Sequence, residues 1–197
     1  LTGDHETIIE EEFLRARVPR GGFTPAHVFP TLLVWATEEQ KQRFLVPLLT
    51  AEKVAWQKWT EPQSGADLAN YQSHAVRDGD DWVLSGQNVF ISGKGNAPDW
   101  LYGPMVTDPD APRHRNLGFF MIPVRDANGE PTEGLEIRNQ NLVNGGDQHF
   151  IFMDDVLVPW EKVFLYRDVD LANNLSPSTH QYNHSGHQVV TKNVAKC

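Results

Sequence analysis

The chain of 197 residues contains one cysteine, Cys197, so it cannot form an internal disulfide. Because a chain without disulfides suits a reducing compartment, we expect a cytoplasmic protein. Basic residues are also few, with 17 Lys and Arg against 26 Asp and Glu, for a formal net charge of −9. Without a basic surface to neutralise phosphates, nucleic acid is excluded as a partner. No apolar run approaches the roughly 20 residues that span a bilayer, so we expect no membrane partner either.

The remaining composition is that of an ordinary globular protein. Hydrophobic residues make up 40% of the chain and charged residues 22%. A chain of this length can bury a sizeable core as one large or two small domains.

The first fifty residues have helical patterns. Ile8, Ile9, Phe13 and Leu14 gather on one face of a predicted helix over residues 4–17. Further on, Thr37-Glu-Glu-Gln predicts a capping box, in which a Thr hydroxyl and a Gln side chain satisfy free amides at a helix start. Pro47 follows in the same helix and is expected to kink or end it, because proline has no N–H to donate.

After residue 51 the pattern changes to short strands separated by turns. The sequence Asp78-Gly-Asp-Asp81 predicts a hairpin turn. Short strands at this spacing indicate an antiparallel barrel or sandwich. The predicted strands are 53–60, 71–77, 82–84, 100–106, 117–124, 135–138 and 149–153.

These patterns divide the chain into three parts. Residues 1–50 are predicted to be a partial helical domain, 51–160 a β-barrel domain, and 161–197 a linker with the start of another helical domain. The fold class is therefore predicted as α+β. Since few single domains have this order, we expect the chain to be the centre of a larger protein.

Residues 57–67, QKWTEPQSGAD, form the most informative loop. Pro62 fixes φ, so the chain turns sharply after Glu61. Gly65 permits a conformation that brings main-chain amides close to a ligand. Such outward N–H groups suit the carbonyl oxygens of a flavin or a pyrophosphate. The simpler interpretation is an ordinary turn that joins two strands.

A second segment, Gly86-Gln-Asn-Val-Phe-Ile-Ser92, lies downstream of this loop. The hydroxyls of Thr60 and Ser92 can donate to a ligand or accept from it. Trp59 and Phe90 supply flat apolar surface for a ring system. The order and spacing of the two segments together favour a binding site over an ordinary turn.

The ordered motifs resemble the acyl-CoA dehydrogenase family over roughly residues 30–160. That resemblance implies helical, β-barrel and helical domains in this order, with FAD held along the β-barrel. The motifs are Ala36-Thr-Glu-Glu-Gln-Lys, Trp59-Thr-Glu-Pro62, Asp78-Gly-Asp, Ser85-Gly-Gln, Phe90-Ile-Ser and Phe152-Met-Asp-Asp-Val-Leu-Val-Pro159.

The resemblance also implies roles for single residues. Thr60 would face the pyrimidine end of the flavin, and Ser92 would lie near its reactive nitrogen. Phe90 replaces the Trp that is more usual beside the ring, and Ala66 stands where many members have a Ser that contacts flavin phosphate or acyl-CoA. Ala66 is therefore also the predicted substrate contact. The predicted cofactor-binding residues are Gln57, Trp59, Thr60, Gly65, Ala66, Phe90, Ile91 and Ser92.

The implied reaction is FAD-dependent α,β-dehydrogenation of an acyl-CoA by a homo-oligomer. A carboxylate base takes the α-proton while flavin takes the β-hydride. In the resembling family this glutamate lies in the C-terminal helical domain. We therefore expect this chain to be a fragment without the base and inactive alone, with its catalytic residues unknown. Glu61 is expected to serve the turn or a salt bridge instead.

Two other functions stay open. Residues 154–168 and 187–196 resemble 4-hydroxyphenylacetate 3-hydroxylase oxygenases, which share the architecture but use reduced flavin and oxygen to hydroxylate phenols. A non-catalytic β-domain that serves in assembly is the third possibility.

A metal site is not predicted. His180, His184 and His187 have the i, i+4, i+7 spacing of one helix face, on which three imidazoles would suit zinc. The Ser-Pro and Ser-Gly pairs nearby argue against a regular helix through them.

Overall fold

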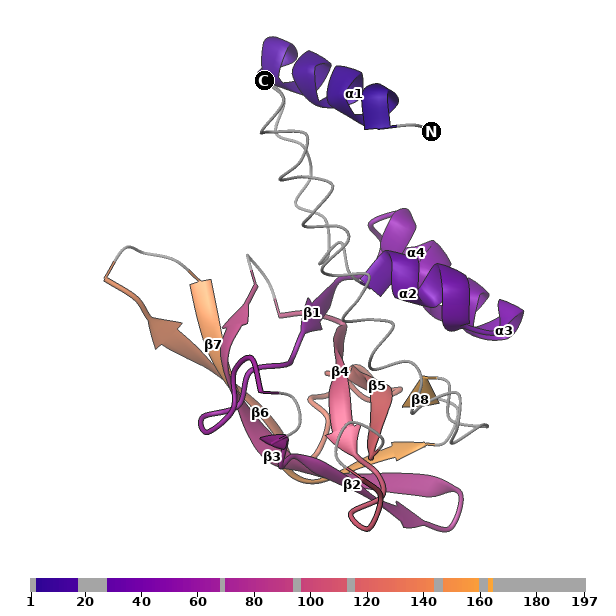
Figure 1. The fold of residues 1–197 in the computed structure, drawn as a ribbon, viewed down its shortest axis with the longest axis vertical. Helices are drawn as coiled ribbons and strands as arrows, with labels where there is room; N and C mark the ends of the chain where they lie inside the picture. The colour runs from indigo at the N-terminus through magenta and orange to yellow at the C-terminus, as the bar shows by residue number, and fades with distance from the viewer. Residues whose placement is uncertain are drawn as a thin grey trace.

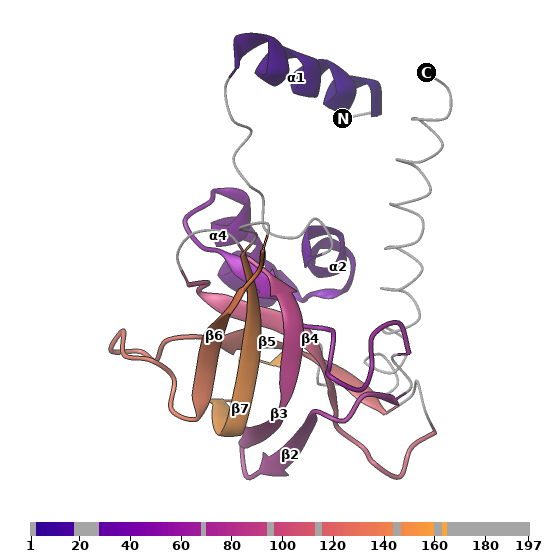
Figure 2. The same ribbon diagram turned by 90° about the vertical axis from the view of Figure 1, so that its left-hand side faces the viewer.

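The computed structural model describes residues 3–17, 28–67, 70–93, 97–112, 116–143, 147–159 and 163–164. The helical segments all precede the strands. In Figures 1 and 2, α1 lies apart from the other elements, while α2 and α4 lie together beyond one end of the sheet. The segments are α1 (Gly3–Ala16), α2 (Val28–Trp35), α3 (Glu38–Gln40), the π-helical turn η1 (Lys41–Leu45) and α4 (Val46–Leu49).

The predicted first helix is present as α1, and its apolar face is exposed to solvent. Ile8, Ile9, Phe13 and Leu14 are exposed, Leu14 by 74%. None of the described helices is long and apolar enough to cross a membrane.

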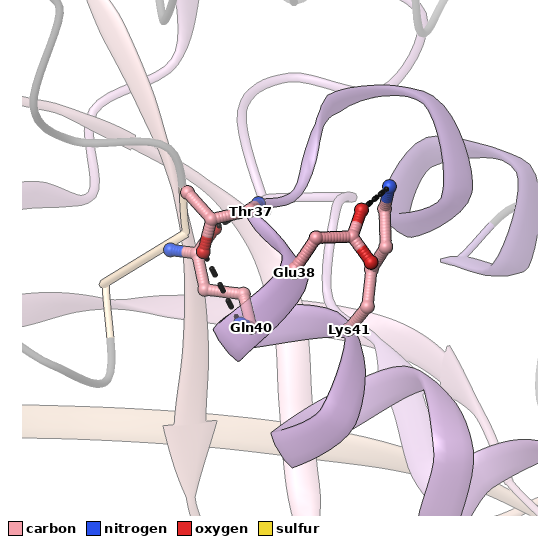
Figure 3. A network of polar contacts seen from close by, with 4 residues as sticks. All are labelled: Thr37, Glu38, Gln40 and Lys41. Carbon is pink, nitrogen blue, oxygen red and sulfur yellow. Dashed lines mark hydrogen bonds and ion pairs between the residues drawn. The ribbon is translucent and has the colours of Figure 1, made fainter.

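The predicted capping box is confirmed at the start of α3 (Figure 3). The Gln40 amide donates to Thr37 Oγ1 at 3.2 Å, and the Thr37 amide donates to Gln40 Oε1 at 3.0 Å. Lys41 also pairs with Glu38 at 2.7 Å in the same turn. These contacts satisfy amide groups that a helix start would otherwise leave without partners.

Thr37→Ala is expected to lower the free energy of unfolding by about 1 kcal/mol, because it removes the acceptor of the Gln40 amide. Urea denaturation followed by circular dichroism measures this loss. Glu39→Ala, an exposed change in the same turn, serves as the control and should alter the midpoint far less. Equal midpoints for the two variants would contradict the capping role.

Pro47 does not end the helix, contrary to one of the two predicted outcomes. The chain widens into η1 before it, and the Val46 amide donates to Lys41 O, five residues back. Pro47 then lies in the first turn of α4, which continues directly from η1. The wider turn carries the helical segment on to Leu49.

One curled sheet contains the strands, and the α+β class is confirmed (Figure 2). The strand order is β6-β7-β3-β2-β4-β5-β8, and β1 pairs with β4 outside this path. The strands are β1 (Ala55–Gln57), β2 (His74–Asp78), β3 (Asp81–Ser92), β4 (Trp100–Val106), β5 (Leu117–Pro123), β6 (Leu135–Asn141), β7 (Asp147–Pro159) and β8 (Val163–Phe164).

The predicted all-antiparallel pairing is wrong at β4, and the sheet is mixed. β1 runs parallel to β4, and β2 meets β4 in parallel at the pair His74↔Val106. The remaining pairs are antiparallel, including the hairpin β2–β3 that closes at Asp78↔Asp81 as predicted. Both parallel pairs lie along one edge of β4, β1 at its start and β2 at its end, because β5 pairs with the whole of the other edge.

Two clusters of buried side chains hold the sheet and the helices together. One fills the inside of the curled sheet and includes Trp82, Leu84 and Phe120, with the Trp82 and Phe120 rings edge to face at 5.7 Å. The other joins the helical segments to β1, β4 and β5 and includes Phe44 and Tyr102. Because β4 and β5 are nearly continuously buried, the loop after β1 is anchored on rigid strands.

Candidate functional site

The Thr-Glu-Pro loop is a tight turn closed by its own backbone. The Glu61 amide donates to Ser64 O at 2.8 Å, and the Ser64 amide donates back to Glu61 O at 3.1 Å. Pro62 lies between them, as the sequence predicts. Gly65 does not have a positive φ, and a Cβ added there would meet nothing within 4 Å. The turn therefore needs no left-handed glycine at this position, since the Glu61–Ser64 bonds already close it. That Gly65 brings main-chain amides close to a ligand stays a prediction.

Glu61 is buried and holds this turn against the start of β2. Its carboxylate accepts from the Gln72 amide at 2.7 Å, from the Ser73 amide at 2.7 Å and from the Ser73 hydroxyl. Gln63 Nε2 donates to it as well, at 2.6 Å. These four hydrogen bonds satisfy the carboxylate without a salt bridge to any described residue. We expected Glu61 to serve either the turn or a salt bridge, and these contacts show that it stabilises the turn.

The turn is tied directly to the second predicted segment, on β3. Thr60 O accepts from the Val89 amide at 2.9 Å and from Asn88 Nδ2 at 3.3 Å. Two segments that lie about thirty residues apart in the sequence therefore meet through one carbonyl. Thr60 and Phe90 belong to the same local surface as a result.

Phe90 lies on a β-bulge that turns it outward. The register moves three residues along β3, from Asn88 to Ile91, but only two along β7, from Ile151 to His149. Phe90 takes φ 58° and is 54% exposed. Since a bulky residue rarely adopts positive φ, the strand holds this aromatic ring outside the core at a cost in backbone energy.

The predicted site residues differ in the solvent exposure of their side chains. Gln57, Trp59 and Thr60 are half-buried, and Gly65, Ala66 and Ser92 are exposed. Ile91 is buried in the core at 2% exposure, so only its main chain could meet a ligand. Trp59 Nε1 is buried without a hydrogen-bond partner among the described residues, which leaves one donor free at the turn.

His149 supports the strand end from behind, a role that sequence reasoning did not anticipate. Its Nδ1 lies 3.2 Å from Ile91 O, and its ring packs against Trp56 at a tilt of 32°, with centroids 4.3 Å apart. A Cβ at Gly93 would come within 2.1 Å of the Trp56 ring. The end of β3 is therefore held by the His149 contact to Ile91 O and by the close packing of Gly93 on the Trp56 ring.

Lys58 is the least expected residue of the loop, because it is fully buried. Its Nζ lies 3.2 Å from Tyr71 Oη, 3.1 Å from Pro104 O and 3.1 Å from Met105 Sδ. Asn88 Nδ2 in turn donates to Tyr71 Oη at 2.9 Å. The predicted strand over residues 53–60 places Lys58 on the same face as Trp56, which is the sequence signal for its burial.

Burial lowers the pKa of the Lys58 amine from 10.5 to about 7, and the nearby Glu61 carboxylate offsets only part of this effect. Burial also raises the pKa of the Tyr71 hydroxyl above its usual range, with Glu61 acting in the same direction. The phenol therefore keeps its proton at neutral pH.

Two clefts lie beside the loop. One, of about 430 Å³, is lined by Glu61, Gln63, Ser73 and Phe152 among others. The second, of about 420 Å³, lies between the start of β2 and residues 106–116. Gln72 and His74 line both clefts, whereas none of the eight predicted cofactor residues lines either.

A comparison with known protein families identifies the family of this chain. The profile described as "Acyl-CoA dehydrogenase, middle domain" matches residues 57–156, which include the turn, the Phe90 bulge and most of the sheet. The chain belongs to the acyl-CoA dehydrogenase family. The curled mixed sheet is thus the middle domain of this family, as the resemblance implied.

Relatives of this acyl-CoA dehydrogenase-family chain support the same assignment. Acyl-CoA dehydrogenase FadE34 of Mycobacterium tuberculosis is 34% identical over 161 residues, which cover 80% of this chain and 22% of the relative. Mitochondrial isobutyryl-CoA dehydrogenase of Dictyostelium discoideum is 37% identical, over 71% of this chain and 41% of its own length. The ChsE4-ChsE5 complex from Mycobacterium tuberculosis has a similar structure, with a TM-score of 0.66 and 30% identity over 80% of this chain and 38% of that one.

The chain therefore spans less than half the length of these relatives. The hydroxylase-like segment beyond residue 164 lies outside the described residues, as do His180, His184 and His187. Among the residues that the structure describes, no three His, Cys, Asp or Glu side chains form a group that could hold a metal ion.

Proposed function

We propose that this chain provides the flavin-binding middle domain of an FAD-dependent acyl-CoA dehydrogenase. The observation that carries the proposal is the shared carbonyl of Thr60, which joins the Thr-Glu-Pro turn to the Phe90 bulge. The eight residues that the resemblance assigns to the cofactor belong to these two segments. Membership of the family supports the same cofactor.

The described residues have groups that suit a flavin. Phe90 presents an exposed ring on a strained bulge, which suits stacking against a flat heterocycle. Thr60 and Ser92 offer hydroxyls, and the buried Trp59 Nε1 has no acceptor among the described residues. We propose that Gln57, Gly65 and Ala66 contact the cofactor along the turn and that Ile91 does so through its main chain.

Bound flavin would accept the hydride of an acyl thioester in the whole enzyme. In this chain the loop would bind and orient the ring, and Ala66 would border the substrate without offering it a hydroxyl. We assign no catalytic base, since the Glu61 carboxylate is engaged by four hydrogen bonds. The base is proposed to belong to a helical domain that follows the sheet in the family.

We propose a homo-oligomer as the assembled state. The structural relative ChsE4-ChsE5 is a complex of two named chains, which supports assembly of subunits in this family. In this chain, the exposed apolar side chains of α1 would lose contact with water in such an assembly.

Titration with FAD tests the proposal, and saturable quenching of flavin fluorescence is the expected result. Thr60→Ala and Ser92→Ala should each weaken binding about tenfold, because each removes one hydrogen bond to the ligand. Ser85→Ala is the matched control, since its hydroxyl bonds Asp155 on the sheet instead. If wild-type protein at high concentration leaves the fluorescence unchanged, the chain does not bind flavin and the proposal fails.

The same protein can be used to distinguish the proposed acyl-CoA substrate from the phenol substrate of the alternative function. If flavin binds, acyl-CoA should perturb the visible flavin spectrum and a phenol should not. A perturbation by phenol alone would favour the reduced-flavin monooxygenase. Absence of flavin binding together with a defined oligomer would favour the non-catalytic assembly domain.

A further inference from the structure

The chain of contacts behind Thr60 begins at Lys58. Lys58 Nζ lies 3.2 Å from Tyr71 Oη, Asn88 Nδ2 donates to the same oxygen at 2.9 Å, and Asn88 Nδ2 also donates to Thr60 O. Only a nitrogen can face the Thr60 carbonyl favourably, so this contact fixes the orientation of the Asn88 amide. A buried amine is thus connected in three steps to the proposed flavin loop.

Counting hydrogens in this cluster distinguishes the two charge states of Lys58. An ammonium group has three hydrogens and would donate to Pro104 O, Met105 Sδ and Tyr71 Oη. Tyr71 Oη would then receive two donors, and its own hydrogen would have no acceptor among the described residues. An unsatisfied buried hydroxyl is costly.

The uncharged amine places every hydrogen in the cluster. Its two hydrogens go to Pro104 O and Met105 Sδ, and its lone pair accepts the phenol hydrogen of Tyr71. Tyr71 Oη then accepts only from Asn88. The burial that lowers the pKa of Lys58 favours the same state.

The charged and titratable surroundings of Lys58 do not reverse this result. Glu61 and Tyr71 are the titratable groups that act on it among the described residues. Glu61 favours the charged amine, but its carboxylate is already satisfied by Gln63, Gln72 and Ser73. From β4 only a carbonyl and a thioether reach the amine, and from β3 only the Asn88 amide lies nearby.

We propose that Lys58, as an uncharged amine, is a positioning residue that fixes Tyr71 and Asn88 and through them holds Thr60 in place for the flavin. The effect on flavin binding rests on the proposed function, whereas the contacts from Lys58 to Thr60 involve only residues of this chain. Protonation of Lys58 removes the acceptor of the Tyr71 hydroxyl hydrogen, which should displace Tyr71 and Asn88 and weaken the hold of Asn88 on the Thr60 carbonyl. Flavin binding should therefore weaken as the pH falls through neutrality.

The charge state can be measured in the wild-type chain without a variant. NMR titration of lysines labelled at Cε should show Lys58 titrating near pH 7, well below the ordinary lysine value of 10.5. A Lys58 signal that titrates with the exposed lysines would overturn the proposal.

Hydrogen exchange at Val89 reports the position of Thr60, because the Val89 amide donates to the Thr60 carbonyl. Lys58→Met and Tyr71→Phe should each reduce its protection factor about tenfold, since one hydrogen bond of the support is lost. Tyr71→Phe keeps the ring and guards against misfolding of the lysine variant. The control is Lys53→Met, whose amine pairs with Asp99 at the surface, and it should leave Val89 protection unchanged.

FAD titration of the same proteins at pH 6 and pH 8 separates this inference from the proposed function. If Val89 protection falls in both variants but the wild type does not bind flavin, the positioning role is retained and the proposed function is refuted. Flavin binding with Val89 protection unchanged in both variants would refute the positioning role alone. If the wild type binds flavin more weakly at pH 6 than at pH 8, and Tyr71→Phe binds it equally at the two pH values, the result supports both the positioning role and the proposed function.

Discussion

Gly103→Ala is expected to lower the free energy of unfolding by about 3 kcal/mol or more. A Cβ at this position would lie 2.0 Å from Lys58 O and 2.7 Å from Lys58 Cγ. Neither group can retreat easily, because the Lys58 amide donates to Tyr102 O at 2.7 Å and the side chain is fully buried. Equilibrium denaturation in urea measures the loss, and the variant should also fail to bind FAD.

Gly65→Ala provides the matched control for this experiment. It makes the same chemical change, in the loop rather than on β4, but an added Cβ meets nothing within 4 Å there and the backbone has no positive φ. Its midpoint should match that of the wild type. A Gly103→Ala protein as stable as the control would show that the loop and β4 can move apart at little cost.

Glu61→Ala should have the second large effect, a loss of about 3 to 5 kcal/mol in the free energy of unfolding. The change leaves the Gln72 amide, the Ser73 amide and the Ser73 hydroxyl without the acceptor that they share. Of the residues involved, Ser73 and Glu61 are buried, so water replaces the carboxylate poorly.

Glu133→Ala, an exposed change from the same residue type, should alter the free energy of unfolding by less than about 0.5 kcal/mol. Glu61→Gln is expected to fall between the two alanine variants, because its amide oxygen still accepts while its NH₂ faces donors. Thermal unfolding followed by circular dichroism ranks the three proteins. Wild-type stability in Glu61→Ala would mean that the turn does not depend on this carboxylate.

Together these predictions separate the support of the proposed site from its surface. Glu61, Lys58 and Gly103 hold the turn against β4 and the start of β2, whereas Thr60, Phe90 and Ser92 would face a ligand. Variants of the first group should change stability and flavin affinity together. Variants of the second group should change affinity with stability near the wild-type value, because their side chains are half-buried or exposed.

Local patterns were sufficient to predict several elements. The Thr37 capping box and the Asp78–Asp81 turn depend on residues a few positions apart, and both form as the sequence indicates. The motif order from the Thr-Glu-Pro turn to the strand ending at Ser92 was also sufficient to predict the family that the comparison supports.

Contacts between distant segments could not be predicted in this way. Pairing of β1 and β2 in parallel along one edge of β4 depends on contacts between segments far apart in the sequence, which no short pattern encodes. The burial of Ile91 and the outward turn of Phe90 follow from one extra residue on β3 relative to β7. A shift of a single residue along a strand moves every later side chain to the opposite face of the sheet. Alternation in the sequence alone therefore did not show which of Phe90 and Ile91 is buried.

The sequence by itself determined the α+β class, the helix start at Thr37 and the hairpin turn at Asp78–Asp81, because these depend on residue types at short spacing. Tertiary structure alone decided that the segments meet at the Thr60 carbonyl and that Lys58 is enclosed by Tyr71, Pro104 and Met105. The physical reason is that burial and hydrogen-bond partners arise from strands brought together over long loops. The charge state of a lysine depends on those partners and on its access to water.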